Sequence, residues 1–211
     1  MNKFCTMQKN EIYYIIIKLN FLAILLCDGN LSFCQVSDSS VPNILLTKQQ
    51  RLHAFVLANV GNFSARIGKP FGNFSAIDID KKEISEASLI GKITLVNFWF
   101  DACAPCHLEF GYINSIFTRY RSDTTFQVLS FSPDNPVELA KNCVKYNLLF
   151  RNLSIPGEVS SNLIGLYHGY PTNYLVDRNG NVSFGYGGIY NDKDLKEVFI
   201  PKIDSLISDG R

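Results

Sequence analysis

Two cysteines, Cys103 and Cys106, are separated by two residues and directly follow a run of apolar, β-forming residues. This spacing lets two sulfurs act in turn on a disulfide, and Pro105 between them suits the first turn of a helix. A helix that begins here places the partial positive charge of its N-terminus beside the first sulfur and favours its thiolate. We therefore interpret Cys103 as an attacking thiolate and Cys106 as the thiol that resolves a mixed disulfide.

The same residues fit two other kinds of site. A structural zinc ion needs four ligands, but His107 is too close to the pair and Cys143 stands alone along the chain. The segment from Cys103 to His107 also matches the CxxCH pattern of covalent haem attachment, with His107 as an axial ligand. A strand that leads straight into the motif and the lack of any methionine after Met7 argue against haem. We expect no metal, and no cofactor beyond a redox-active Cys103–Cys106 disulfide.

Residues 1–35 predict an export signal. Lys3 gives the segment a positive start, apolar stretches follow, and Ser32-Phe33-Cys34 before Gln35 offers small residues where a signal peptidase cuts. Lys18 interrupts the apolar run, so an unbroken span of about 20 apolar residues is missing. A permanent membrane anchor and a lipid attached to Cys27 are the alternatives to cleavage.

Cysteine usage and charge narrow the class of protein. Of the six cysteines, a mature chain would keep Cys103, Cys106 and Cys143, an odd set that indicates redox chemistry instead of a stapled secreted domain. Cys143 lies on an apolar helix face and is expected to be a small core residue. The 20 Lys and Arg residues balance 19 Asp and Glu residues without a basic, aromatic-rich cluster. Nucleic acid is therefore not an expected partner.

Strand and helix patterns alternate after residue 66 and predict an α/β fold, a central mixed β-sheet flanked by helices. We divide the chain into the signal or anchor at 1–35, an N-terminal extension at 36–66 with a helix-like run at 45–60, and one domain at 67–211. The expected strands are 74–79, 93–100, 126–131, 172–176 and 182–186, the last two joined as a hairpin by an Asn-Gly turn. The expected helices or helical turns are 84–90, 105–120 with Leu108 in its apolar stripe, 137–146, 160–168 and 192–208, the last disturbed by Pro201.

Three motifs follow one another along the chain: Ile67-Gly68-Lys69-Pro70 with Phe74, the segment from Gly91-Lys92 to Cys106, and Tyr170-Pro171-Thr172-Asn173-Tyr174-Leu175-Val176-Asp177 with Gly180. Together they resemble the TlpA/ResA-type branch of the thioredoxin superfamily, an exported bacterial group, over about residues 67–208. The resemblance implies a thioredoxin-like fold and thiol-disulfide oxidoreductase activity at Cys103 and Cys106. It also implies a cis Pro171 that faces the redox pair, with Tyr170 offering backbone hydrogen bonds to a bound polypeptide. A plain turn proline is the alternative.

Several positions depart from the family's pattern. Ala102 replaces the tryptophan that usually precedes the first cysteine, while Trp99 remains as a packing residue or a client contact. Asn97 stands where thioredoxins proper carry a buried aspartate, which removes the usual proton acceptor. Glu109 matches a glutamate that often follows the motif and is a candidate catalytic residue; the alternative is a solvated helix residue.

Asp134 is our other candidate for moving the proton of Cys106. It follows the strand at 126–131, which neighbours the cysteine-bearing strand in a thioredoxin-like sheet, so its loop lies at the edge that holds the sulfurs. The alternative is that Asp134 or Asn135 simply caps the helix that Pro136 begins.

These patterns together predict an exported enzyme that reduces or rearranges disulfides of envelope proteins. Its expected location is the periplasm or cell envelope, with a possible membrane tether through the N-terminus. Its expected partners are exported protein substrates and a membrane or periplasmic dithiol electron donor. A peroxiredoxin-like antioxidant is the alternative, although such peroxidases usually rely on a TxxC pattern with a nearby arginine, and none stands between Arg66 and Arg119. A binding module without catalysis is a further alternative.

Overall fold

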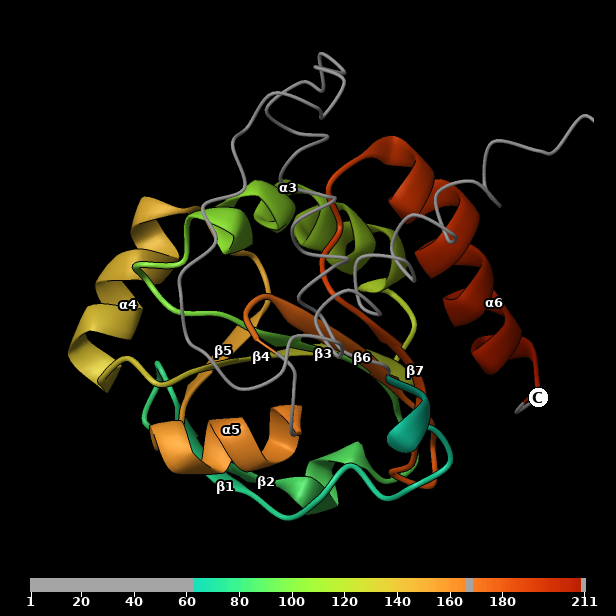
Figure 1. Ribbon diagram of the computed structural model, residues 1–211, viewed down its shortest axis with the longest axis horizontal. Coiled ribbons are helices and arrows are strands. Elements are labelled where there is room, and N and C mark those ends of the chain that lie inside the picture. Colours follow the sequence, from blue (N-terminus) through green and yellow to red (C-terminus); the bar gives the residue numbers. More distant parts are fainter. Residues whose placement is uncertain (1–62, 166–168, 210–211) are drawn as a thin grey trace, which may run out of the picture. The chain divides into compact units, whose positions relative to one another are not determined.

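The computed structural model describes residues 63–165 and 169–209, which form a mixed sheet with helices on both faces (Figure 1). The predicted export signal, the helix-like run at 45–60 and His168 lie outside the described residues. The strands are β1 (Ser75–Asp78), β2 (Glu83–Ser85), β3 (Ile93–Phe98), β4 (Phe126–Ser132), β5 (Arg151–Ser154), β6 (Thr172–Val176) and β7 (Val182–Tyr186). The α-helices are α3 (Ala104–Tyr120), α4 (Pro136–Lys145), α5 (Gly157–Ile164) and α6 (Ile200–Ser208), and the shorter helical turns are η1 (Phe63–Ala65), η2 (Glu86–Leu89) and the π-helical η3 (Asp194–Phe199).

The seven strands follow the spatial order β2-β1-β5-β4-β3-β6-β7. β3 pairs in parallel with β4 and antiparallel with β6, and all six of its side chains are buried. This burial on both faces explains the nearly continuous apolar run in its sequence. β4 also pairs in parallel with β5, so the carboxyl ends of β3, β4 and β5 share one edge of the sheet.

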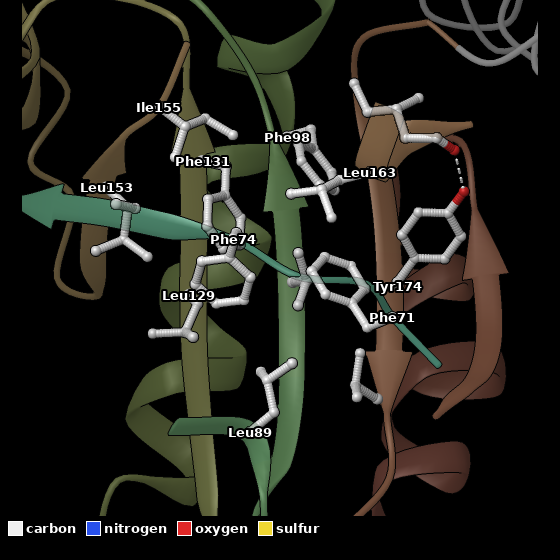
Figure 2. Packing of buried hydrophobic residues seen from close by; sticks show 14 of the residues in the cluster. Phe71, Phe74, Leu89, Phe98, Leu129, Phe131, Leu153, Ile155, Leu163 and Tyr174 are labelled. Carbon is white, nitrogen blue, oxygen red and sulfur yellow. Dashed lines mark hydrogen bonds between the residues drawn. The ribbon is translucent and has the colours of Figure 1, made fainter. Parts of the chain in front are cut away.

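Helices α3, α4 and α6 lie on one side of the sheet and α5 lies on the other (Figure 1). The core on the α5 side is rich in aromatic rings, with Phe71 and Phe131 stacked close to Phe98 (Figure 2). Tyr174 in this core donates its hydroxyl hydrogen bond to the carbonyl of Ile164 at the end of α5. This core holds one face of the sheet whose edge carries the cysteines.

The predicted sheet flanked by helices is confirmed, including the hairpin of β6 and β7. Several local predictions differ from the structure. The segment 84–90 holds the expected helical turn, η2, but also the end of β2; α5 begins at Gly157 instead of residue 160, and β5 was missed. Leu108 is 51% exposed and does not belong to the buried stripe of α3. That stripe consists of Cys106, Glu109, Phe110, Ile113, Ile116 and Tyr120.

The last helix is disturbed near Pro201, as predicted: six residues of π-helix, η3, precede the regular helix α6. Proline lacks an N–H and its ring crowds the preceding turn, which accounts for a change of helix type just before it. Within the described ranges, every helix is too short or too polar to cross a lipid bilayer.

Candidate active site at Cys103 and Cys106

The two cysteines lie at the junction of β3 and α3, where the sequence predicted them. Cys103 is the N-cap residue of α3, Pro105 occupies its first turn, and the amide of Cys106 donates to the carbonyl of Cys103 at 3.0 Å. The two residues form a disulfide with Cα atoms 5.4 Å apart. Cys103 therefore stands where the unpaired N–H groups and partial positive charge of the helix favour a thiolate.

The two halves of the disulfide differ in exposure. Cys103 retains 5% of its surface, whereas Cys106 retains none. Both pack into a small apolar cluster with Trp99 and Phe110 from either side of the motif and with Leu139 and Cys143 from α4. Only Cys103 can meet a disulfide of another protein without local opening of the fold, which supports its assignment as the attacking sulfur.

The Tyr170–Pro171 peptide bond is cis, as the resemblance implied. Tyr170 is partly buried and packs against the cluster that contains both cysteines. Its ring meets Phe100 edge to face at 5.0 Å, and its hydroxyl shares a 2.7 Å hydrogen bond with Ser160. Burial raises the pKa of the Tyr170 hydroxyl, which therefore stays protonated. The segment just before β6 thus borders the redox pair.

Glu109 is fully buried, so the alternative that it is a solvated helix residue was wrong. Its carboxylate accepts hydrogen bonds from Asn97 Nδ2 at 2.7 Å, Asn173 Nδ2 at 2.8 Å and the Ile189 amide at 3.0 Å. Loss of hydration on burial raises its pKa from 4.5 to about 7, although the three hydrogen bonds oppose that rise. A group with this pKa can accept and return a proton near neutral pH.

Asn97, at the position where the resemblance implied that the usual proton acceptor is absent, is hydrogen-bonded to the buried Glu109. Its side chain accepts from Ser130 Oγ at 2.8 Å and donates to Glu109. Asn97 therefore positions the glutamate, and the glutamate carries the ionisable group. Glu109 follows Cys106 by three residues on α3, and side chains at that spacing are neighbours on one helix face. Both belong to the buried stripe of α3. The buried carboxylate of this site therefore lies on α3, and Asn97 of β3 donates to it.

Asp134 lies on the sheet edge that carries the cysteines, but its side chain supports a loop. Its Oδ2 accepts from the Asp101 amide at 2.9 Å and from Ser132 Oγ at 2.9 Å. The cap of α4 is Asn135, whose side chain accepts from the amides of Val137 and Glu138. Capping by Asn135 is confirmed, while Asp134 instead ties the end of β4 to the loop before Cys103.

A cluster of polar side chains around Asp101 extends outward from that loop. Asp101 Oδ1 accepts from Tyr146 Oη at 2.8 Å and from Lys145 Nζ at 3.2 Å. These two partners, Tyr146 first, lower the pKa of the Asp101 carboxyl. The Tyr146 ring in turn stacks on His107, with centroids 4.3 Å apart. No sequence pattern marks this group, because its members come from three separate segments of the chain.

The two remaining candidates near the motif are interior residues. Trp99 has no exposed surface, so its assignment as a client contact was wrong and its role as a packing residue is confirmed. Cys143 is buried, as predicted, and burial raises the pKa of its thiol to about 11. Within 63–165 and 169–209, no three His, Cys, Asp or Glu side chains are grouped in a way that could hold a metal ion.

Comparison with known proteins agrees with this geometry. The profile of the AhpC/TSA family matches residues 67–184, from the first motif into β7. The chain belongs to the AhpC/TSA family. Thiol-disulfide oxidoreductase ResA of Bacillus cereus is 32% identical over 120 residues, which are 56% of this chain and 67% of that protein. Thiol:disulfide interchange protein DsbE of Pseudomonas aeruginosa is 25% identical over 148 residues, 69% of this chain and 80% of its own.

Solved structures confirm the thioredoxin-like fold of this family member. The thioredoxin domain of a thiol-disulfide oxidoreductase from Bacteroides vulgatus matches 65% of this chain and 96% of its own, with a TM-score of 0.56 and 22% identity. The relatives and the family assign the chain as a thiol-disulfide oxidoreductase of the thioredoxin-like type.

Proposed function

We propose that this oxidoreductase reduces or rearranges disulfides of exported proteins in the cell envelope, by dithiol-disulfide exchange at Cys103 and Cys106. The observation that carries the proposal is the pairing of an exchangeable disulfide at a helix N-terminus with a buried glutamate on the same helix face. The first feature supplies a nucleophile, and the second supplies a proton acceptor for the resolving thiol.

The exchange begins with the reduced enzyme. The Cys103 thiolate attacks one sulfur of a client disulfide; the client S–S bond breaks, and the other client sulfur leaves as a thiolate that takes a proton from water. Cys106 then transfers its proton to the Glu109 carboxylate and attacks the Cys103 sulfur. The Cys103–Cys106 bond forms and the second client thiol departs, so two electrons have moved to the client. A dithiol donor must then reduce the enzyme disulfide.

Client binding is proposed at the segment before β6. Tyr170 packs against the cluster that contains both cysteines, and the Tyr170–Pro171 bond is cis, as the resemblance implied. A bound polypeptide could add to that backbone as a short strand, since main-chain hydrogen bonds give affinity without demanding one sequence. Asp134 fixes the loop that precedes Cys103 by accepting from the Asp101 amide.

Export and the identity of the partners rest on the sequence. Residues 1–35 carry the signal pattern, and the ResA and DsbE names of the relatives fit thiol chemistry on proteins. The proposed partners are exported protein substrates and a membrane or periplasmic dithiol donor. Nucleic acid has no place in this scheme, given the balanced charge.

Trapping of clients in the native host tests the proposal. The Cys106→Ser variant of the full chain should accumulate mixed disulfides with envelope proteins, because the resolving thiol is gone. The matched control Cys103→Ser/Cys106→Ser should trap none, and Cys143→Ser/Cys106→Ser should trap the same set. Capture through Cys143, or efficient turnover of hydrogen peroxide without disulfide reductase activity on insulin, would contradict the assignment.

A further inference from the structure

A pocket of about 500 Å³ opens among β2, η2, β4, β5 and the C-terminal end of α3. Its apolar lining includes Phe117 of α3 and Phe126 of β4, and its polar lining includes Gln127. β4 pairs with β3 from its first residue, but β5 begins only opposite Leu129. The first three residues of β4 therefore have no strand on the β5 side, and this gap in the sheet makes room for the pocket.

This pocket is separate from the disulfide site. It lies where β4 and β5 begin, at Phe126 and Arg151, and beside Lys92 just ahead of β3. Cys103, in contrast, follows the carboxyl end of β3. A six-residue strand spans roughly 20 Å, so the two sites occupy opposite ends of the sheet. Nothing in the exchange chemistry uses the pocket.

The charge of the pocket has one sign. Lys82, Lys92, Arg121 and Arg151 line it, and no aspartate or glutamate does. Arg151 Nε lies 3.7 Å from Asp78 Oδ2, and Lys92 Nζ donates to a backbone carbonyl at 3.0 Å, so these two are partly engaged.

Lys82 and Arg121 make no side-chain ion pair or hydrogen bond with the rest of the described chain. The nearest acidic neighbour of Arg121 in sequence, Asp123, accepts from the amide and hydroxyl of Thr125 and is not part of the lining. Two cations thus face the pocket with their charge uncompensated by a lining carboxylate.

We propose that this pocket binds a small organic anion with a flat apolar body. Cationic side chains at the rim complement a carboxylate, sulfonate or phosphate group, and Arg121 can offer two parallel N–H donors to it. The aromatic and aliphatic walls complement the apolar part of the same molecule. A volume of about 500 Å³ is within the roughly 300–1,000 Å³ of small-molecule sites.

A pair of dyes tests the two halves of this inference. 8-Anilinonaphthalene-1-sulfonate carries an anionic group on a flat aromatic body, and N-phenyl-1-naphthylamine is the same body without the charge. Fluorescence titration of the full-length protein measures the Kd of each dye. In the variant Lys82→Gln/Arg121→Gln we expect the sulfonate to bind about tenfold more weakly, since two charge-assisted contacts are lost, and the uncharged dye to bind unchanged.

The control variant is Lys69→Gln/Lys193→Gln, which removes the same charge from surfaces outside the pocket. It should keep the native Kd for the sulfonate. An unchanged sulfonate Kd in Lys82→Gln/Arg121→Gln would overturn the proposal, because the dye would then be bound elsewhere. Equal weakening in the control, or equal weakening of the uncharged dye, would overturn it as well.

Discussion

Two carboxylates near the redox pair, Glu109 and Asp134, sit in regions of opposite character. Glu109 is buried among β3, β6 and the Ile189 backbone, and loss of water raises its pKa to about 7. Asp134 lies in the partly exposed loop after β4 and ties that loop to the Asp101 amide. Burial gives Glu109 a pKa at which it can exchange a proton near neutral pH, whereas the position of Asp134 on the sheet edge makes it a hydrogen-bond acceptor that holds a loop.

The largest expected effect is on stability as pH changes. The unfolded chain releases the Glu109 proton near pH 4.5, whereas the folded chain holds it to about pH 7. The folded state binds more proton in that interval, so the free energy of unfolding falls as pH rises through it, by an amount on the order of 3 kcal/mol. Denaturant unfolding of the oxidised protein across this range measures the fall.

The matched variants separate the two regions. Glu109→Gln should unfold with a flatter pH dependence between 4.5 and 7 than the native protein, because the group that changes its charge has been removed. Asp134→Asn should retain the native slope. The reverse pattern would show that the titrating group belongs to the loop.

Asp134 should matter to structure more than to chemistry. Asp134→Ala removes the acceptor of the Asp101 amide and of Ser132 Oγ, and we expect a loss of about 1–2 kcal/mol in the free energy of unfolding. Asp134→Asn keeps an oxygen acceptor and should lose less than half of that. Thermal or denaturant unfolding of the two variants checks the difference. Equal losses would mean that the charge of Asp134, not its acceptor geometry, holds the loop.

A smaller effect is expected further out in the same loop. Tyr146→Phe removes the 2.8 Å hydrogen bond to Asp101 and should cost about 0.5–1 kcal/mol above pH 4, where Asp101 is ionised. That hydrogen bond lowers the pKa of Asp101, so its contribution disappears once acid protonates the carboxyl below its ordinary value of 3.8. The difference between Tyr146→Phe and native protein should therefore vanish in strong acid. A pH-independent difference would assign the loss to ring packing on His107.

The sequence could predict the parts of the site that local pattern controls. The two-residue spacing of Cys103 and Cys106 directly after an apolar strand predicted the redox pair. The motif around Pro171 predicted its cis peptide bond. The family resemblance made Glu109 a candidate, but its burial and raised pKa could not be predicted, because its hydrogen-bond partners lie 12, 64 and 80 residues away along the chain.

The missed elements have similar causes. β5 contains the polar residues Asn152 and Ser154 in a four-residue strand, so neither length nor alternation of apolar residues marks it. Asn152 is fully buried because β5 pairs with β4, and that long-range pairing is not marked by any local pattern in the sequence. Leu108 was assigned to the wrong face of α3. Successive residues of a helix point about 100° apart, so Leu108 faces solvent although its neighbour Glu109 is buried.

The most direct test of the account is the rate at which Cys106 resolves a mixed disulfide on Cys103. Ellman's reagent releases one chromophore when Cys103 attacks it and a second when Cys106 displaces the mixed disulfide, so the second phase in stopped flow reports resolution. In native protein that rate should rise with pH through a midpoint near 7, where Glu109 becomes able to accept the proton. In Glu109→Gln it should be about 10²-fold slower and lack that midpoint, while Asp134→Asn behaves as native. An unchanged second phase in Glu109→Gln at every pH would contradict the assignment of Glu109 as the proton acceptor.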